Sequence, residues 1–394
     1  MRTLTPTYCI RQGGRCGLIF FVILIYSLHL NEGILHAREA PPSEEATPAD
    51  GHKTGEESEK NDFQKWAFFP VIASETETGL QLGGMVVRFF EPESSGLRTS
   101  TIDLVAFGTT EQQYYSGLSS DYYFKKDLYR LNFAFSGRLW PANFYGIGSD
   151  SNEDDKEKFE STAFDTAIAF ERKFHDIVYA GIQYKFENSW IDQESPDPGG
   201  TIAGGRVLGA EGGIRSGLGA IVSLDTRDNL NDSRTGELIQ TGVLFFKDGF
   251  GSDFDYSMYT LDMRKYITLA GVTGLGIRGY AQVLRGDIPF QDLSSPDGYG
   301  ILRGIEKGRY RDRDLIAFEA EWRFPIYKRF GGTLFTETAQ VAHDITDLYH
   351  DNWVTGAGAG LRYALNPSEK FNIRIDVAWV DSGFGLTIGM REAF

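Results

Sequence analysis

The sequence predicts an all-β fold, a sixteen-stranded antiparallel transmembrane β-barrel. Three observations lead to this prediction. The 394 residues include 46 Gly, 29 Phe and 19 Tyr, a composition that favours strands and tight turns over helices. The strand-like segments place apolar residues on one face and charged residues on the other. The connections between these segments alternate between short turns and long loops, as they do in outer-membrane barrels.

The segment from Asp314 to Ile326 shows the two faces most clearly. Apolar residues occupy one face, namely Ile316, Phe318, Ala320, Trp322, Phe324 and Ile326, and the other face holds Ala317, Glu319, Glu321 and Arg323. A soluble sandwich would point the apolar face inward, whereas a transmembrane barrel points it to lipid. Arginines recur on the polar faces of Leu128–Leu139 and Phe371–Trp379, which suits a wet lumen rather than a dry core.

Strand-like segments of about ten residues, separated by turn signals, fill the chain from Phe63 to Phe394. The expected starts lie near Ala67, Leu80, Leu97, Gln112, Asp127, Phe159, Phe174, Ala210, Glu237, Phe254, Val272, Arg313, Gly332, Trp353, Lys370 and Gly383. The short connections are expected on the periplasmic side and the long ones, such as Trp140–Lys158 and Gly286–Asp312, outside. Asp225–Gly236 is an exception, because it is a longer link on the short side.

The amino-terminal residues 1–37 are expected to form a signal peptide. Three arginines precede the apolar run Gly17–Leu30, which is too short for a comfortable transmembrane helix, and a cleavage site follows Ala37. An uncleaved anchor is the alternative. Cys9 and Cys16 both lie in this segment, so a processed chain is expected to contain no thiol.

Residues 38–62 are expected to form a disordered acidic periplasmic lead, because Pro, Glu, Ser and Ala without apolar periodicity cannot bury enough surface to fold. The barrel is then expected over residues 63–394.

The last strand is expected over Gly383–Phe394, with the aromatic terminal residue on its outward face. A terminal aromatic residue at an alternating position is similar to the carboxy-terminal signal of bacterial outer-membrane barrels, so Phe394 is a candidate signal residue. The alternative is an edge strand of a soluble sheet. Glycines at 383, 385 and 389 leave the seam between the last strand and the first with few side chains to lock it.

The charge and the candidate catalytic residues exclude several functions. A formal charge of −16 without a basic stripe argues against nucleic acid as a partner. His343, Asp344, Asp347, His350 and Asp351 share one loop, and Asp150–Asp155 has oxygen ligands at calcium-like spacing, but both groups are expected to be solvated loop tips. No catalytic motif is present, so we expect no enzyme, no metal and no cofactor.

Six stretches together resemble the bacterial surface antigen family, the BamA/TamA-type barrel of outer-membrane assembly and translocation proteins. They are Trp140–Ser149 (WPANFYGIGS), Asp225–Asn229 (DTRDN), Leu302–Ile305 (LRGI), Glu321–Ile326 (EWRFPI), Leu334–Val341 (LFTETAQV) and the terminal Phe394. The resemblance implies that the sixth extracellular loop folds into the lumen, where Arg303 of the Arg-Gly motif pairs with Glu321 and Glu337. A guanidinium can satisfy two carboxylates at once, and Gly304 lets the loop backbone approach the wall.

The chain departs from the family pattern at three positions near this motif. Ile305 stands where Phe or Tyr is usual, Glu337 where Asp is usual, and Ala339 where Gly is usual. A longer Glu side chain can reach the same point with a different rotamer, so the pairing is still expected.

The largest departure from the family is at the amino-terminal end, because its members that insert or secrete proteins carry periplasmic POTRA repeats and residues 38–62 are too few to form one. The chain is therefore expected to be a form of this barrel without POTRA domains. The expected function is to assist insertion or translocation of proteins or lipids at the bacterial outer membrane, as an integral multi-pass barrel. The expected partners are outer-membrane lipid, unfolded outer-membrane or secreted proteins, and a separate periplasmic protein. The alternative is a passive channel or a structural or adhesive surface barrel without transport activity.

Overall fold

The computed structural model describes residues 65–75, 79–94, 97–193, 199–269, 273–297, 301–348, 352–367, 369–380 and 383–394. All of them belong to one compact unit, Asn61–Phe394. The expected signal peptide and acidic lead, residues 1–62, lie outside the described residues.

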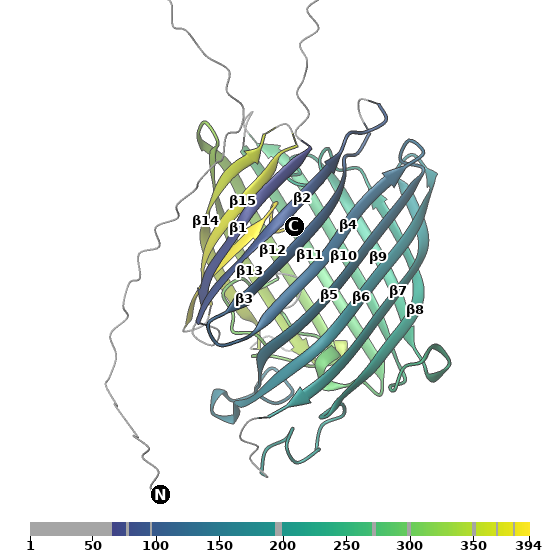
Figure 1. Ribbon diagram of the computed structural model, residues 1–394, viewed down its shortest axis with the longest axis vertical. Coiled ribbons are helices and arrows are strands. Elements are labelled where there is room, and N and C mark those ends of the chain that lie inside the picture. The colour runs from purple at the N-terminus through teal and green to yellow at the C-terminus, as the bar shows by residue number, and fades with distance from the viewer. Residues whose placement is uncertain are drawn as a thin grey trace, which may run out of the picture. The chain divides into compact units, whose positions relative to one another are not determined.

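Sixteen strands follow one another in chain order in a single antiparallel sheet, and Figure 1 shows them tilted side by side around a barrel. This confirms the predicted fold class and strand number; the largest shift in a start is at β7, which begins at Val178 instead of Phe174. The strands are β1 (Trp66–Glu75), β2 (Gly79–Phe90), β3 (Ser100–Thr109), β4 (Tyr114–Phe124), β5 (Tyr129–Phe144), β6 (Glu157–His175), β7 (Val178–Asp192), β8 (Gly212–Asp225), β9 (Gly236–Phe246), β10 (Tyr256–Leu269), β11 (Thr273–Gly286), β12 (Asp314–Tyr327), β13 (Phe330–Ala342), β14 (Val354–Asn366), β15 (Phe371–Val380) and β16 (Gly383–Met390).

Short 3-10 helices lie in the connections: η1 (Glu153–Asp155), η2 (Asp248–Phe250), η3 (Phe290–Asp292) and η5 (Ile345–Asp347). Among the described residues, no helix is long and apolar enough to cross a membrane.

The faces of β12 are inverted relative to a soluble protein. Phe318 and Trp322 on the apolar face are 52% and 43% exposed, whereas Glu321 on the charged face is fully buried. Exposed aromatic and aliphatic side chains recur on the same outward face of the other strands, among them Phe164, Ile182, Ile277, Leu361 and Leu386. An outward apolar band around a charged interior is the arrangement that a bilayer requires.

We expect the outward side chains of β12 to stabilise the folded barrel only when a bilayer surrounds it. Phe318→Arg should destabilise the protein by about 2–4 kcal/mol, the range measured for a charge near the bilayer midplane. Phe250→Arg is the matched control, because Phe250 is also exposed, at 45%, but lies in η2 outside the strands. Urea unfolding from lipid vesicles measures both variants, and equal losses would contradict a lipid-facing β12.

The two ends of the sheet meet through an apolar group that we call the seam cluster, Ala67, Phe69, Val87, Phe89 and Phe371. The rings of Phe69 in β1 and Phe371 in β15 stack with centroids 6.0 Å apart, and Met390 at the end of β16 packs against the cluster. The first and last strands are therefore held together from the lumen side.

The long connections close one end of the barrel. Twelve buried side chains, which we call the cap cluster, pack together there: Phe144, Phe159, Ile202, Val207, Leu244, Phe246, Tyr256, Met258, Leu284, Ile288, Phe290 and Leu293. They come from the adjoining ends of β5, β6, β9, β10 and β11 and from the β7–β8 and β11–β12 loops. Apolar packing therefore fills part of the lumen on the side of the long loops.

The exceptional β8–β9 link, residues 226–235, lies against the chain terminus at the opposite end. Asn231 donates to the Glu369 carbonyl at 2.8 Å and accepts from the Glu392 N–H at 3.0 Å. Burial raises the pKa of Asp228, but hydrogen bonds from the backbone N–H groups of Thr235 and Arg234 outweigh it and lower that pKa. The link is longer than a turn because it contacts other segments.

Candidate functional site: the loop lock in the lumen

The β11–β12 loop folds back into the lumen, as the sequence predicts for the sixth long-side connection. Its two arms pair at Ser294 and Asp312, whose backbone groups exchange hydrogen bonds of 2.7 and 3.1 Å. Ile301 and Leu302 are buried against β11 to β15, on the halves of these strands that lie nearest the long loops. This apolar contact brings the next residue, Arg303, against the strands.

Arg303 reaches both carboxylates that the sequence singles out. Its backbone N–H donates to Glu337 Oε2 at 2.8 Å, its Nε donates to Glu337 Oε1, and its Nη1 donates to Glu321 Oε2 at 2.8 Å. All three side chains are nearly inaccessible to solvent. We call Arg303, Gly304, Glu321 and Glu337 the loop lock.

Two further groups contact Arg303 that the sequence analysis did not assign to the lock. Asp376 of β15 accepts from Nη1 at 3.1 Å, and the ring of Phe335 lies under the guanidinium with its centroid 3.4 Å away. Asp376 lies on the polar face of the strand-like segment Phe371–Trp379. Its charge at an inward-facing position marks it as a candidate. The sequence of its own strand does not give the strand register that places it beside Arg303.

Gly304 places the loop backbone against the last two strands. Its φ of +84° is left-handed, and a Cβ there would lie 3.1 Å from both Ala378 Cβ and Gly385 Cα. Conversely, a Cβ on Gly385 of β16 would overlap the backbone of Gly304. Glycine is therefore required on both sides of this contact, which links the loop tip to the strand at the seam.

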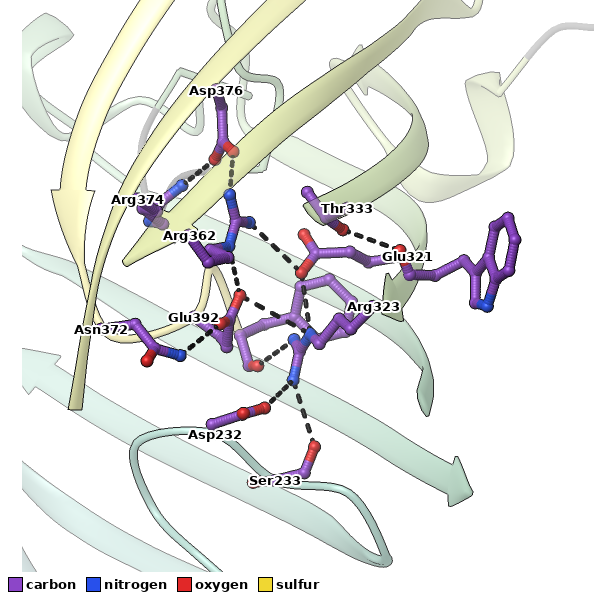
Figure 2. Close-up of polar contacts among 12 residues, drawn as sticks. Asp232, Ser233, Glu321, Arg323, Thr333, Arg362, Asn372, Arg374, Asp376 and Glu392 are labelled. Carbon is purple, nitrogen blue, oxygen red and sulfur yellow. Dashed lines mark hydrogen bonds and ion pairs between the residues drawn. The ribbon is translucent and has the colours of Figure 1, made fainter. Parts of the chain in front are cut away.

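The lock continues toward the other end of the barrel as a chain of alternating charges (Figure 2). Arg323 donates to Glu321 at 2.8 Å and to the Phe394 carbonyl at 2.9 Å. In parallel, Arg362 donates to Asp376 and to Glu392, the latter at 2.7 Å. Because each buried carboxylate has arginine partners, the cluster avoids the large penalty of an unpaired buried charge.

The carboxy-terminal residues differ from the prediction. Strand β16 ends at Met390, and Phe394 is buried, with its ring 6.3 Å from Tyr266, instead of facing lipid at the end of a strand. The expected outward position of Phe394 is wrong because Arg391 has a φ of +61°, which turns the chain inward. Its role as an assembly signal stays a prediction.

The polar loop tips lie apart from the lock. The side chain of His343 is 68% exposed, and Asp344 accepts hydrogen bonds from the Thr346 N–H and hydroxyl, which lower its pKa. His350 and Asp351 lie outside the described residues. Asn152 in the other candidate loop caps η1. In the part of the chain that the structure describes, no three His, Cys, Asp or Glu residues gather as a metal site.

This fold and lumen define an outer-membrane β-barrel whose interior is occupied by its own loop. A model of the Omp85 superfamily domain matches residues 98–389, and the chain belongs to that family.

Two solved structures share the fold at low sequence identity. BamA from Haemophilus ducreyi lacking POTRA domains 1–3 matches with a TM-score of 0.53 and 12% identity, over 83% of this chain and 69% of that one. CdiB from Acinetobacter baumannii matches with a TM-score of 0.51 and 12% identity, over 82% of this chain and 60% of that one. No curated protein matches the sequence.

Proposed function

We propose that this barrel assists insertion or translocation of proteins or lipids at the bacterial outer membrane, and that the seam between β1 and β16 is where it acts. The observation that carries the proposal is the form of the last strand. β16 spans eight residues, whereas β10, β11 and β12 each span fourteen, and glycines occupy positions 383, 385 and 389. A short strand with few side chains is the weakest join in the wall.

The loop lock supports this assignment by stiffening the neighbouring wall. Arg303 joins β12, β13 and β15 through Glu321, Glu337 and Asp376. These strands resist separation because parting them would leave buried charges without partners. The wall then opens most easily at the seam. Unpaired backbone groups of β1 and β16 can there accept an incoming strand by β-augmentation, and the opening can admit lipid headgroups to the lumen.

The proposed clients are outer-membrane lipid and unfolded outer-membrane or secreted proteins, with delivery by a separate periplasmic protein. BamA and CdiB share the fold and support this choice of compartment and client class. The alternative is a passive channel, which a lumen cavity of about 680 Å³ favours. The cap cluster argues against it, because it packs into the lumen on the side of the long loops.

A reversible lock across the seam tests the proposal. Ala67→Cys with Met390→Cys places one thiol on β1 and one on β16 beside the seam cluster. Oxidation should abolish insertion of a urea-unfolded barrel protein into liposomes and transfer of fluorescent phospholipid between leaflets, and reduction should restore both.

The control pair is Trp379→Cys with Phe384→Cys, which joins the outward-facing partners of β15 and β16 and leaves the seam free. Activity that survives seam oxidation, or is lost equally in the control, would overturn the proposal. A steady single-channel conductance with neither activity would favour the passive channel.

A further inference from the structure

Two neighbouring cavities lie in the lumen of the described barrel. The first, which we call the chamber, has a volume of about 680 Å³ and a mostly apolar wall, although Asp103, Gln240, Thr260 and Arg264 also line it. Leu244 and Met258 line it and also belong to the cap cluster, so the chamber ends under the cap.

The second cavity, which we call the vestibule, has a volume of about 520 Å³ and lies at the end opposite the cap. It is lined by residues of the connections at that end, among them Arg98 of the β2–β3 link, Asp176 of the β6–β7 turn and Asn229 of the β8–β9 link, and by Glu369 of the β14–β15 turn. These connections lie on the periplasmic side in the proposed orientation. The vestibule therefore faces the periplasm.

Among the residues that the structure describes, Asp121 and Arg391 alone line both cavities. Arg391 Nη2 donates to Asp103 at 3.0 Å and to the Thr101 hydroxyl at 3.1 Å, and Nη1 donates to Asp121 at 3.3 Å. Asp103 lines the chamber alone and Thr101 the vestibule alone. The guanidinium thus lies across the boundary, bonded to one group on each side of it.

The position of Arg391 in the chain connects this boundary to the seam. It is the first residue after β16, and its backbone N–H is held by the Asn372 carbonyl at 2.8 Å. Its acceptors lie on β3 and β4, beyond β1 and β2. The side chain therefore crosses the seam on the lumen side, and any displacement of β16 must pull it away from Asp103 and Asp121.

We propose that Arg391 is a latch that closes the passage between the vestibule and the chamber and that opens when β16 moves. With the latch closed, Arg391 lies at the periplasmic end of the chamber and the cap cluster at the other end. With the latch open, a small solute or a stretch of an unfolded chain enters the chamber from the periplasm. The latch can be tested whether or not the seam inserts anything.

Thiol accessibility measures the latch directly. In a background with Cys9→Ser and Cys16→Ser, Ala167→Cys places a reporter in the chamber, and Leu230→Cys places one in the vestibule. Both proteins are reconstituted into liposomes and treated with a charged thiol reagent, whose reaction rate follows access to the thiol.

Arg391→Ala should raise the labelling rate of the chamber reporter by at least about tenfold, as expected for a thiol that gains access to the reagent. The vestibule reporter should react at an unchanged rate. The double variant Asp103→Asn and Asp121→Asn should raise the chamber rate as well, because it removes the two negative charges that hold the guanidinium and leaves Arg391 itself unchanged. Retained heat-modifiable migration on gels shows that each variant is folded.

Arg264→Ala is the matched control. Arg264 lines the chamber and pairs with Asp262 at 2.6 Å, away from the boundary, so its loss widens the chamber without opening it. An equal rise in this control, or an unchanged chamber rate in both latch variants, would overturn the proposal.

Discussion

Arg303→Ala is expected to destabilise the folded barrel by about 3–5 kcal/mol, the range for removing one partner of a buried ion pair. The substitution would leave Glu321, Glu337 and Asp376 in the wall without their shared guanidinium. It also removes the anchor of the β11–β12 loop, so that residues 301–313 should become cleavable by added protease. Urea titration in vesicles measures the first effect, and timed proteolysis measures the second.

Two comparisons make this result specific to the lock. Arg303→Lys keeps the charge but lacks the planar fork, so it should recover only part of the lost stability. Lys265→Ala removes a surface cation whose pair with Glu237 is half-exposed, and it should change stability by at most about 1 kcal/mol. A loss for Arg303→Ala no larger than for Lys265→Ala would mean that the lock does not hold the loop.

Gly385→Ala adds one carbon atom and is expected to separate the tip of the β11–β12 loop, at Gly304, from strand β16. The new Cβ would overlap the backbone of Gly304, which cannot move aside as a flexible side chain could. Overpacking of this kind costs about 1–3 kcal/mol. The loop should therefore become protease-sensitive, and the thermal midpoint should fall.

Gly383→Ala is the matched control on the same strand, because its Cβ would have Val380 O as its nearest neighbour at 3.5 Å, an ordinary contact. This variant should keep the parent stability and protease resistance. If both variants behave alike, the contact between loop and seam strand has no structural role.

The sequence predicts the strands and their faces well, since a period of two is a local property that each strand displays by itself. The β12 pattern from Ile316 to Ile326 gives the direction of its side chains without knowledge of any neighbour. Arg303, Glu321 and Glu337 also stand out locally, since charged residues in apolar surroundings need partners.

The remaining features depend on contacts between distant segments. Asp376 and Gly385 come from β15 and β16, and only the register of those strands brings them to the loop. The inward turn at Arg391 is set by backbone geometry that arginine rarely adopts, and alternation in Gly383–Phe394 gives no sign of it. The latch is equally hidden, because its acceptors Asp103 and Asp121 lie at the opposite end of the sequence.

The order of the lock partners along the chain has a consequence for how the protein itself is built. Arg303 precedes every acid that holds it, and the last of these, Asp376, lies on β15. The β11–β12 loop can complete its ion pairs only after β15 has joined the sheet. In a nascent barrel, docking of the loop therefore reports that the late strands are in place.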